Sequence, residues 1–290
     1  MSECLRSQLA DRGVIRVTGE DAREFLQGLV SNDMRRVAPD RAIYAALLTP
    51  QGKYLFDFFI AEADGALLID CERARLPELI KRLTIYKLRA KAALENVSDG
   101  FKIAALWGGD AGGLGLGPEP GSAAAYAGGV AFTDPRLAAA GVRLIVPVDA
   151  ALPDGSDADA EAYDAHRLSL GLPDGSRDMV LEKAILLESG FDELNGVDWK
   201  KGCYMGQELT ARTKYRGLVK KRLVPVGIEG PLPEPGTPVM SGDREVGELR
   251  SGQGGRALAL IRLEALEDGA AELRAGDARV RPEKPNWASF

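Results

Sequence analysis

Histidine and cysteine are scarce in this chain of 290 residues, and their scarcity excludes several kinds of site. The single histidine, His166, excludes a metal site built from several histidines. The three cysteines, Cys4, Cys71 and Cys203, are too few and too far apart for a disulfide framework or a CxxC metal motif. We therefore predict no metal-binding residues.

A surplus of basic residues is also missing, because 37 Lys and Arg stand against 43 Asp and Glu. Nucleic-acid binders gain affinity by replacing counterions with Lys and Arg, so we expect no direct nucleic-acid binding. No run of about 18 apolar residues occurs, and the N-terminal MSECLRSQLADRG lacks the apolar stretch of a secretory signal. We expect a cytoplasmic protein with no membrane partner.

The pattern of apolar residues predicts an α+β protein. Residues 13–18 alternate as a strand does, and a helix is expected from Asp21, with Thr18 and Asp21 as an approximate capping box and an apolar stripe reaching Val30. Residues 42–72 predict three strands, which break at residues 50–52 and 63–65, and a helix follows. This order of strands and helices is typical of α+β layers.

Turn-forming residues divide the chain further. The glycine-rich stretch 108–121 predicts a connection rather than a phosphate loop, since Pro118 and Pro120 oppose the helix that such a loop needs. Short alternating segments after Arg222 predict a small β-barrel. We expect three domains: an α+β region at 1–150, an α+β region at 151–221 and a β-barrel at 222–290.

The segment LNGVDWKKGCYMGQELTARTKYRG, residues 194–217, combines a thiol, an amide, carboxylates, cations and glycines. Gly202 and Gly206 flank Cys203 and permit turns closed to other residues. Nearby cations, Lys200, Lys201 and Arg212, would stabilise a thiolate, and Gln207 with Glu208 offers the donor and acceptor pair that a pterin needs. The alternative is a tight turn around a buried, inert cysteine.

Within that segment, KGCYMGQE resembles the KGCYxGQE signature of the YgfZ/GcvT-like folate-binding family, and ELTART resembles its mitochondrial iron–sulfur assembly branch. Four further segments carry the resemblance: FLQGLVSND at 25–33, RAIYAALLTPQGKYLFDFFI at 41–60, LLESGFDELNGV at 186–197 and KKRLVPV at 220–226. The resemblance implies a three-domain ring like that of the glycine-cleavage aminomethyltransferase, with tetrahydrofolate in a central channel and a C-terminal β-barrel.

The resemblance also implies a function. It predicts a tetrahydrofolate-binding accessory protein for the assembly or maintenance of iron–sulfur proteins, including enzymes that modify transfer RNA. Its partners would be a reduced folate and iron–sulfur client or assembly proteins, and Cys203 would be the functional thiol. The predicted folate-binding residues are Glu188, Trp199, Lys201, Gly202, Tyr204, Gln207, Glu208 and Arg212.

Two departures from the aminomethyltransferase indicate a non-catalytic homologue. Its adjacent aspartates are reduced here to Leu55-Phe56-Asp57, and its R-x-E-x-G pattern reads Arg167-Leu168-Ser169-Leu170-Gly171. Glu188 is a candidate for the missing carboxylate or else a solvated helix-end residue. The alternative function is a folate-dependent aminomethyl or one-carbon transferase that uses Asp57 as its acid/base group.

Three other features have two interpretations each. The basic stretch Lys81 to Lys91 can meet the glutamate tail of folate or form a solvated helical face. Tyr163 and Trp199 can stack on a flat ligand or pack in the core.

Overall fold

The computed structural model describes residues 3–109, 113–267 and 272–290, and in these the chain forms two units. Unit 1 contains the described residues of Met1–Leu48, Leu55–Ala160 and Leu194–Met205. Unit 2 contains those of Thr49–Tyr54, Glu161–Glu193 and Gly206–Phe290. Each unit therefore draws on segments far apart in the sequence. The expected boundaries at residues 150 and 221 stay a prediction.

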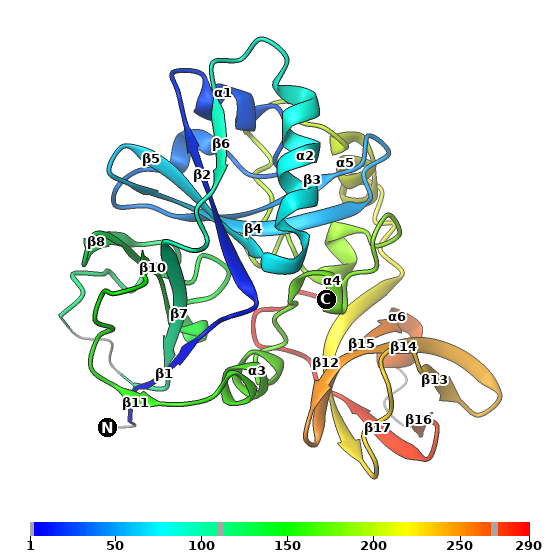
Figure 1. The fold of residues 1–290 in the computed structure, drawn as a ribbon. Helices are drawn as coiled ribbons and strands as arrows, with labels where there is room; N and C mark the ends of the chain where they lie inside the picture. The colour runs from blue at the N-terminus through cyan, green and yellow to red at the C-terminus, as the bar shows by residue number, and fades with distance from the viewer. Residues whose placement is uncertain (1–2, 110–112, 268–271) are drawn as a thin grey trace. The chain divides into compact units, whose positions relative to one another are not determined.

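Unit 1 holds two sheets (Figure 1). One has five strands in the order β3 (Ile43–Leu48), β4 (Tyr54–Ala63), β5 (Ala66–Glu72), β2 (Arg12–Thr18) and β6 (Ala93–Asn96). The other has six, in the order β11 (Ser156–Asp157), β1 (Leu5–Gln8), β7 (Phe101–Trp107), β10 (Val142–Pro147), β9 (Gly129–Thr133) and β8 (Ala123–Tyr126). All six residues of β3 are buried, as expected of a strand with both faces covered.

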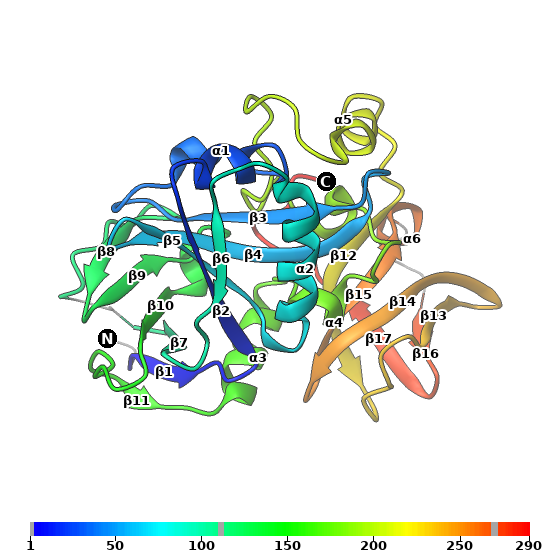
Figure 2. The ribbon, with the colours of Figure 1, turned by 45° about the horizontal axis from the view of Figure 1, so that its top comes forward.

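Two helices belong to the five-stranded sheet, and Figure 2 shows α2 crossing its strands. Helix α2 (Leu76–Lys87) buries Leu76, Leu79 and Leu83, which recur at helical spacing. Helix α1 (Ala22–Gln27) is shorter than predicted, because Leu29 and Val30 close a turn onto the carbonyl of Leu26. The capping box is wrong as well. Asp21 is the N-cap residue, but its carboxylate accepts from the Lys91 amide instead of capping the helix.

Buried ion pairs join the two sheets of unit 1. Asp70 on β5 is fully buried and accepts from Arg12 on β2 at 2.6 Å and from Arg143 on β10 at 2.7 Å. Arg136 and Asp134 form a second buried pair at 2.8 Å. Removing one member would strand a buried charge, so these residues are a structural network.

Unit 2 contains a closed six-stranded barrel, as the sequence predicts. Its strands are β12 (Lys221–Glu229), β15 (Arg256–Arg262), β14 (Arg244–Gln253), β13 (Pro238–Ser241), β16 (Leu273–Ala275) and β17 (Ala278–Pro282), in spatial order.

The remaining helices of the described chain are α3 (Ala160–Ser169), α4 (Gly175–Asp178), α5 (Gln207–Tyr215) and α6 (Leu263–Glu267). Short 3₁₀ turns lie at Met34–Arg36, Arg73–Arg75, Ala138–Ala140 and Leu186–Ser189.

Most predicted elements are present. The strand at 13–18, the three strands of 42–72 and the helix after them are β2, β3 to β5 and α2. The turn at 63–65 contains Asp64 and Gly65, both at positive φ. Part of the predicted connection at 108–121, residues 110–112, lies outside the described residues.

Candidate functional site

Cys203 lies in an irregular stretch of unit 1 that precedes α5, and its side chain is exposed. Gly202 before it has φ +94°, a conformation that side-chain-bearing residues rarely adopt, whereas Tyr204 after it is buried. The exposure removes the alternative of a buried cysteine. The structure describes all three cysteines and none forms a disulfide; Cys71 is buried, and burial raises the pKa of its thiol to about 12.

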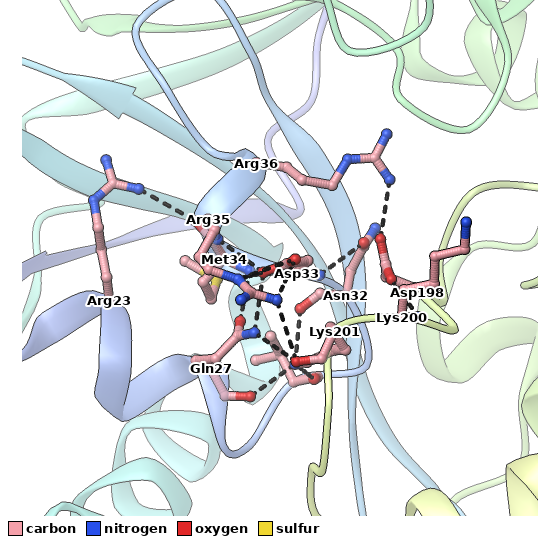
Figure 3. A network of polar contacts seen from close by, with 11 residues as sticks. Arg23, Gln27, Asn32, Asp33, Met34, Arg35, Arg36, Asp198, Lys200 and Lys201 are labelled. Carbon is pink, nitrogen blue, oxygen red and sulfur yellow. Dashed lines mark hydrogen bonds and ion pairs between the residues drawn. The ribbon is translucent and has the colours of Figure 1, made fainter.

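Lys201 fastens this stretch to the segment that follows α1. Its side chain is only 5% exposed, and its ammonium donates to the carbonyl oxygens of Gln27 at 2.7 Å, Asn32 at 2.9 Å and Val30 (Figure 3). The three N–H groups of the ammonium therefore have three carbonyl acceptors, so its hydrogen-bonding capacity is filled. The sequence offered Lys201 as a ligand contact or a partner of the thiol, but the structure directs its charge to the backbone.

Further hydrogen bonds hold the same two segments together. The Gln27 amide donates to the Lys201 carbonyl at 3.2 Å, and the Met205 amide donates to the Gly28 carbonyl at 3.1 Å. On the other side of the cysteine, the Asp198 amide donates to the Ser31 carbonyl at 3.1 Å. Cys203 is thus exposed on a stretch whose backbone is fixed on both sides.

Charges around this junction are paired locally, as Figure 3 shows. Asp33 binds Arg35 at 2.9 Å, and this contact lowers the pKa of the Asp33 carboxyl. Arg36 binds Asp198 at 3.3 Å. Burial lowers the pKa of Lys201 to about 8, because taking an ammonium out of water disfavours its charged form. Trp199 is half-buried in the same unit.

The rest of the motif lies in unit 2, at the start of α5. Gly206 is the N-cap residue with φ +79°, and Gln207 behind it is half-buried. Glu208 and Arg212 are exposed and pair with each other one turn apart. The structure thus places Trp199, Lys201, Gly202, Cys203 and Tyr204 in unit 1, and Glu188, Gln207, Glu208 and Arg212 in unit 2.

Glu188 lines a pocket of about 310 Å³ within unit 2. It lies on the 3₁₀ turn Leu186–Ser189 and is half-buried, which disfavours the interpretation of a solvated helix-end residue. Burial raises the pKa of its carboxyl, while Lys221, Lys53 and Arg222 lower it. A carboxylate that is costly to bury gains from a ligand that donates hydrogen bonds to it.

Arg167, the arginine of the altered R-x-E-x-G pattern, is buried in unit 2, and each of its three guanidinium nitrogens donates a hydrogen bond. It donates to Asp178 at 2.8 Å, to Asp164 at 2.6 Å and to the Ser251 hydroxyl at 2.6 Å. The exposed Ser169 donates to the His166 carbonyl. Carboxylates of the protein itself therefore bind this guanidinium, and Arg167 has a structural role.

Asp57, the acid/base candidate of the alternative function, is 6% exposed in unit 1. Its carboxylate accepts from the Tyr44 hydroxyl at 2.8 Å, and burial raises the pKa of Tyr44 well above its ordinary value. Tyr163, a stacking candidate, is buried and packs against His166 with ring centroids 6.4 Å apart, which favours its core interpretation.

The basic stretch at the end of α2 has partners of its own. Arg82 lies 3.9 Å from Glu78, Lys87 donates to the Ala92 carbonyl at 2.9 Å, and Lys91 binds Glu20. These local contacts favour a solvated helical face. Among the described residues, no group of three or more His, Cys, Asp or Glu is placed to hold a metal ion.

Sequence reasoning missed the role of Gln27, Val30 and Asn32, which hold the motif through Lys201. The available signal was their position within FLQGLVSND, one of the segments that carry the family resemblance. Nothing in that segment indicates that its carbonyl oxygens meet a lysine about 170 residues later.

Comparison with known proteins first defines the class. The GCVT N-terminal domain matches residues 9–114, and the C-terminal beta-barrel domain of CAF17 matches residues 220–290. The crystal structure of glycine cleavage system aminomethyltransferase T from Bartonella henselae shares the fold with a TM-score of 0.79 at 15% identity, covering 99% of this chain and 87% of that one. The predicted GcvT-like α+β fold with a C-terminal barrel is confirmed.

Curated relatives then define the family. Iron-sulfur cluster assembly factor IBA57, mitochondrial, of Mus musculus is 34% identical over 314 residues, which are 98% of this chain and 85% of the relative. Its counterpart in Homo sapiens is 35% identical over 313 residues with the same coverage. This chain belongs to the IBA57 family of GcvT-like proteins.

The expected cytoplasmic location is wrong, because these relatives are named as mitochondrial proteins. The expectation rested on missing apolar runs, and these do not distinguish a cytoplasm from an organelle. In the part of the chain that the structure describes, no helix is long and apolar enough to cross a membrane.

Proposed function

We propose that this protein acts in iron–sulfur cluster assembly, that it binds a reduced folate, and that Cys203 supplies its functional thiol. Membership of a family whose curated relatives are named iron-sulfur cluster assembly factors carries the first part. The exposure of Cys203 on a fixed backbone supports the last, since a thiol that exchanges with a partner or ligates a shared cluster must be accessible. Its partners would be iron–sulfur client or assembly proteins, among them enzymes that modify transfer RNA.

The pocket around Glu188 supports the folate part of the proposal. Its volume of about 310 Å³ falls in the range of small-molecule sites, roughly 300 to 1,000 Å³. A pterin ring presents two neighbouring N–H donors, which would satisfy the half-buried carboxylate of Glu188. Lys221 and Lys183 also line this pocket and would attract the anionic part of a folate.

Titration calorimetry with 5-formyltetrahydrofolate tests the folate proposal. We expect saturable binding, and Glu188→Gln should weaken it about tenfold or more, because an amide offers one acceptor oxygen in place of two. Glu264→Gln, which changes an exposed residue of α6, is the matched control and should bind like the parent. Absence of heat with millimolar ligand, or equal binding by Glu188→Gln, would contradict the proposal.

The transferase alternative is less well supported, because Asp57 is buried and already accepts a hydrogen bond from Tyr44. An acid/base group must reach the proton that it moves. We expect no transfer of a one-carbon unit from a secondary or tertiary amine to tetrahydrofolate. Turnover that Asp57→Asn abolishes would favour the alternative.

A further inference from the structure

Unit 1 contains a pocket of about 240 Å³ that the proposed function does not use. Its apolar walls include Ile43, Pro120 and Pro135. Two side chains of opposite charge, Arg41 and Glu119, also line it. The volume suits a ligand smaller than a typical cofactor.

Neither of these two charged side chains has a charged partner among the described residues; Arg41 is half-buried and Glu119 is exposed. Within the described residues, the structure gives the Arg41 guanidinium and the Glu119 carboxylate no hydrogen bond and no ion pair, with each other or with any other group. Arg36 lines the same pocket but differs from Arg41, because its guanidinium forms an ion pair with Asp198 (Figure 3). Arg41 is moreover half-buried, and a half-buried cation without a counterion carries a desolvation cost that an anionic ligand group would offset.

Asn195 adds an acceptor to the pocket. It is one of few non-glycine residues with positive φ, at +57°, and its side-chain amide nitrogen donates to the Pro135 carbonyl at 3.1 Å. This bond fixes the amide group and leaves its oxygen, Oδ1, to accept a hydrogen bond. A non-glycine residue in this conformation at a pocket is typical of functional sites.

We propose that this pocket binds the zwitterion of a small α-amino acid. The ligand carboxylate would pair with Arg41, its ammonium with Glu119 and Asn195 Oδ1, and its side chain would contact Ile43 and the two prolines. A simple anion such as phosphate would meet the Glu119 carboxylate, and a simple amine would meet Arg41. Only a ligand with both charges satisfies both residues.

The first experiment is an NMR titration of the full chain with small neutral L-amino acids, L-alanine, L-valine and L-leucine. For the amino acid that binds most tightly, the matching carboxylate without its amino group and the matching amine without its carboxylate are titrated next. We expect each to bind at least about tenfold more weakly, since each leaves one protein charge unpaired. Dissociation constants all above about 10 mM, or equal binding of the comparison compounds, would overturn the proposal.

Substitutions test the residues. Arg41→Gln and Glu119→Gln should each weaken amino acid binding about tenfold or more and leave folate binding unchanged. Arg244→Gln, which breaks an exposed ion pair in the barrel, is the control and should bind like the parent. Unchanged binding in Arg41→Gln would overturn the proposal. So would a double-mutant cycle of unfolding free energies that shows Arg41 and Glu119 coupled to each other, since the two would then be an ion pair. Because folate is measured separately, its failure to bind would leave this result intact.

Discussion

The ammonium group of Lys201 lies among three carbonyl oxygens, with its pKa lowered by burial to about 8 from an ordinary 10.5. Between these two pH values the unfolded chain holds a proton that the folded chain has released. The unfolding free energy contributed by this lysine should therefore rise with pH, by at most about 1.4 kcal/mol per pH unit, and stay constant below about pH 8.

Urea unfolding of the parent and of Lys201→Met, from pH 7 to pH 10, measures this contribution as a difference. We expect the difference to shift in favour of the parent as pH rises. Lys200→Met removes the exposed neighbouring lysine and should show no such slope. A difference that is flat or falls with pH would contradict the lowered pKa of Lys201.

The sequence indicates which residues belong to the candidate site, but it does not predict which groups those residues contact. Cys203 stands in a segment of 24 residues unusually rich in reactive and polar groups, so it could be selected without coordinates. The charge of Lys201 also indicates a site residue. Its partners, however, are the backbone carbonyl oxygens of Gln27, Val30 and Asn32, and every residue type has a carbonyl. The sequence therefore predicts which side chains carry chemistry better than what they bind.

The turn between β3 and β4 packs against the start of α5 within unit 2. A Cβ atom on Gly52 would lie 2.6 Å from the Gly206 carbonyl oxygen and 2.6 Å from the Leu209 Cβ, and Gly52 has φ +82°. Gly52→Ala combines a clash with backbone strain, so we expect a loss of about 2 to 4 kcal/mol of unfolding free energy.

The matched control is the next hairpin, where Gly65 has φ +73° and no atom within 4 Å of an added Cβ. Gly65→Ala should cost only the backbone strain, about 1 to 2 kcal/mol. Equal losses in chemical denaturation for Gly52→Ala and Gly65→Ala would mean that the turn does not pack on α5.

Long helices and strands can be predicted from the pattern of their own residues, whereas short ones depend on the segments that they pair with. Strand β4 and helix α2 have ten and twelve residues with clear periodicity, and both were predicted. Strand β11 has two residues, and it exists because Leu5 and Arg6 pair with it in parallel. Helix α1 ends early because the apolar spacing that suggested a longer helix continues through a turn, where Leu29 and Val30 remain buried.

Each of the two units is built from three separate ranges of the sequence, and no local sequence pattern predicts this division. The fold class could be predicted because strands, helices and a final run of β segments follow one another in order, and because the motif resembles one family. The location could not, since proteins of several compartments share a composition without long apolar runs.

We propose that the Cys203 thiol has a function rather than a packing role. Cys203→Ser replaces sulfur by oxygen on an exposed side chain, so its unfolding free energy should change by less than about 1 kcal/mol. Cys4→Ser is the better of the two possible controls, because Cys71 is buried in β5 and its replacement would disturb the core.

The most direct measurement is the activity of iron–sulfur enzymes in cells that lack their own family member and receive each variant. We expect the parent and Cys4→Ser to restore that activity and Cys203→Ser, folded and present at the same level, to leave it near the deletion background, because a hydroxyl is a far poorer nucleophile and metal ligand than a thiolate. Full restoration by a folded Cys203→Ser protein would contradict the account.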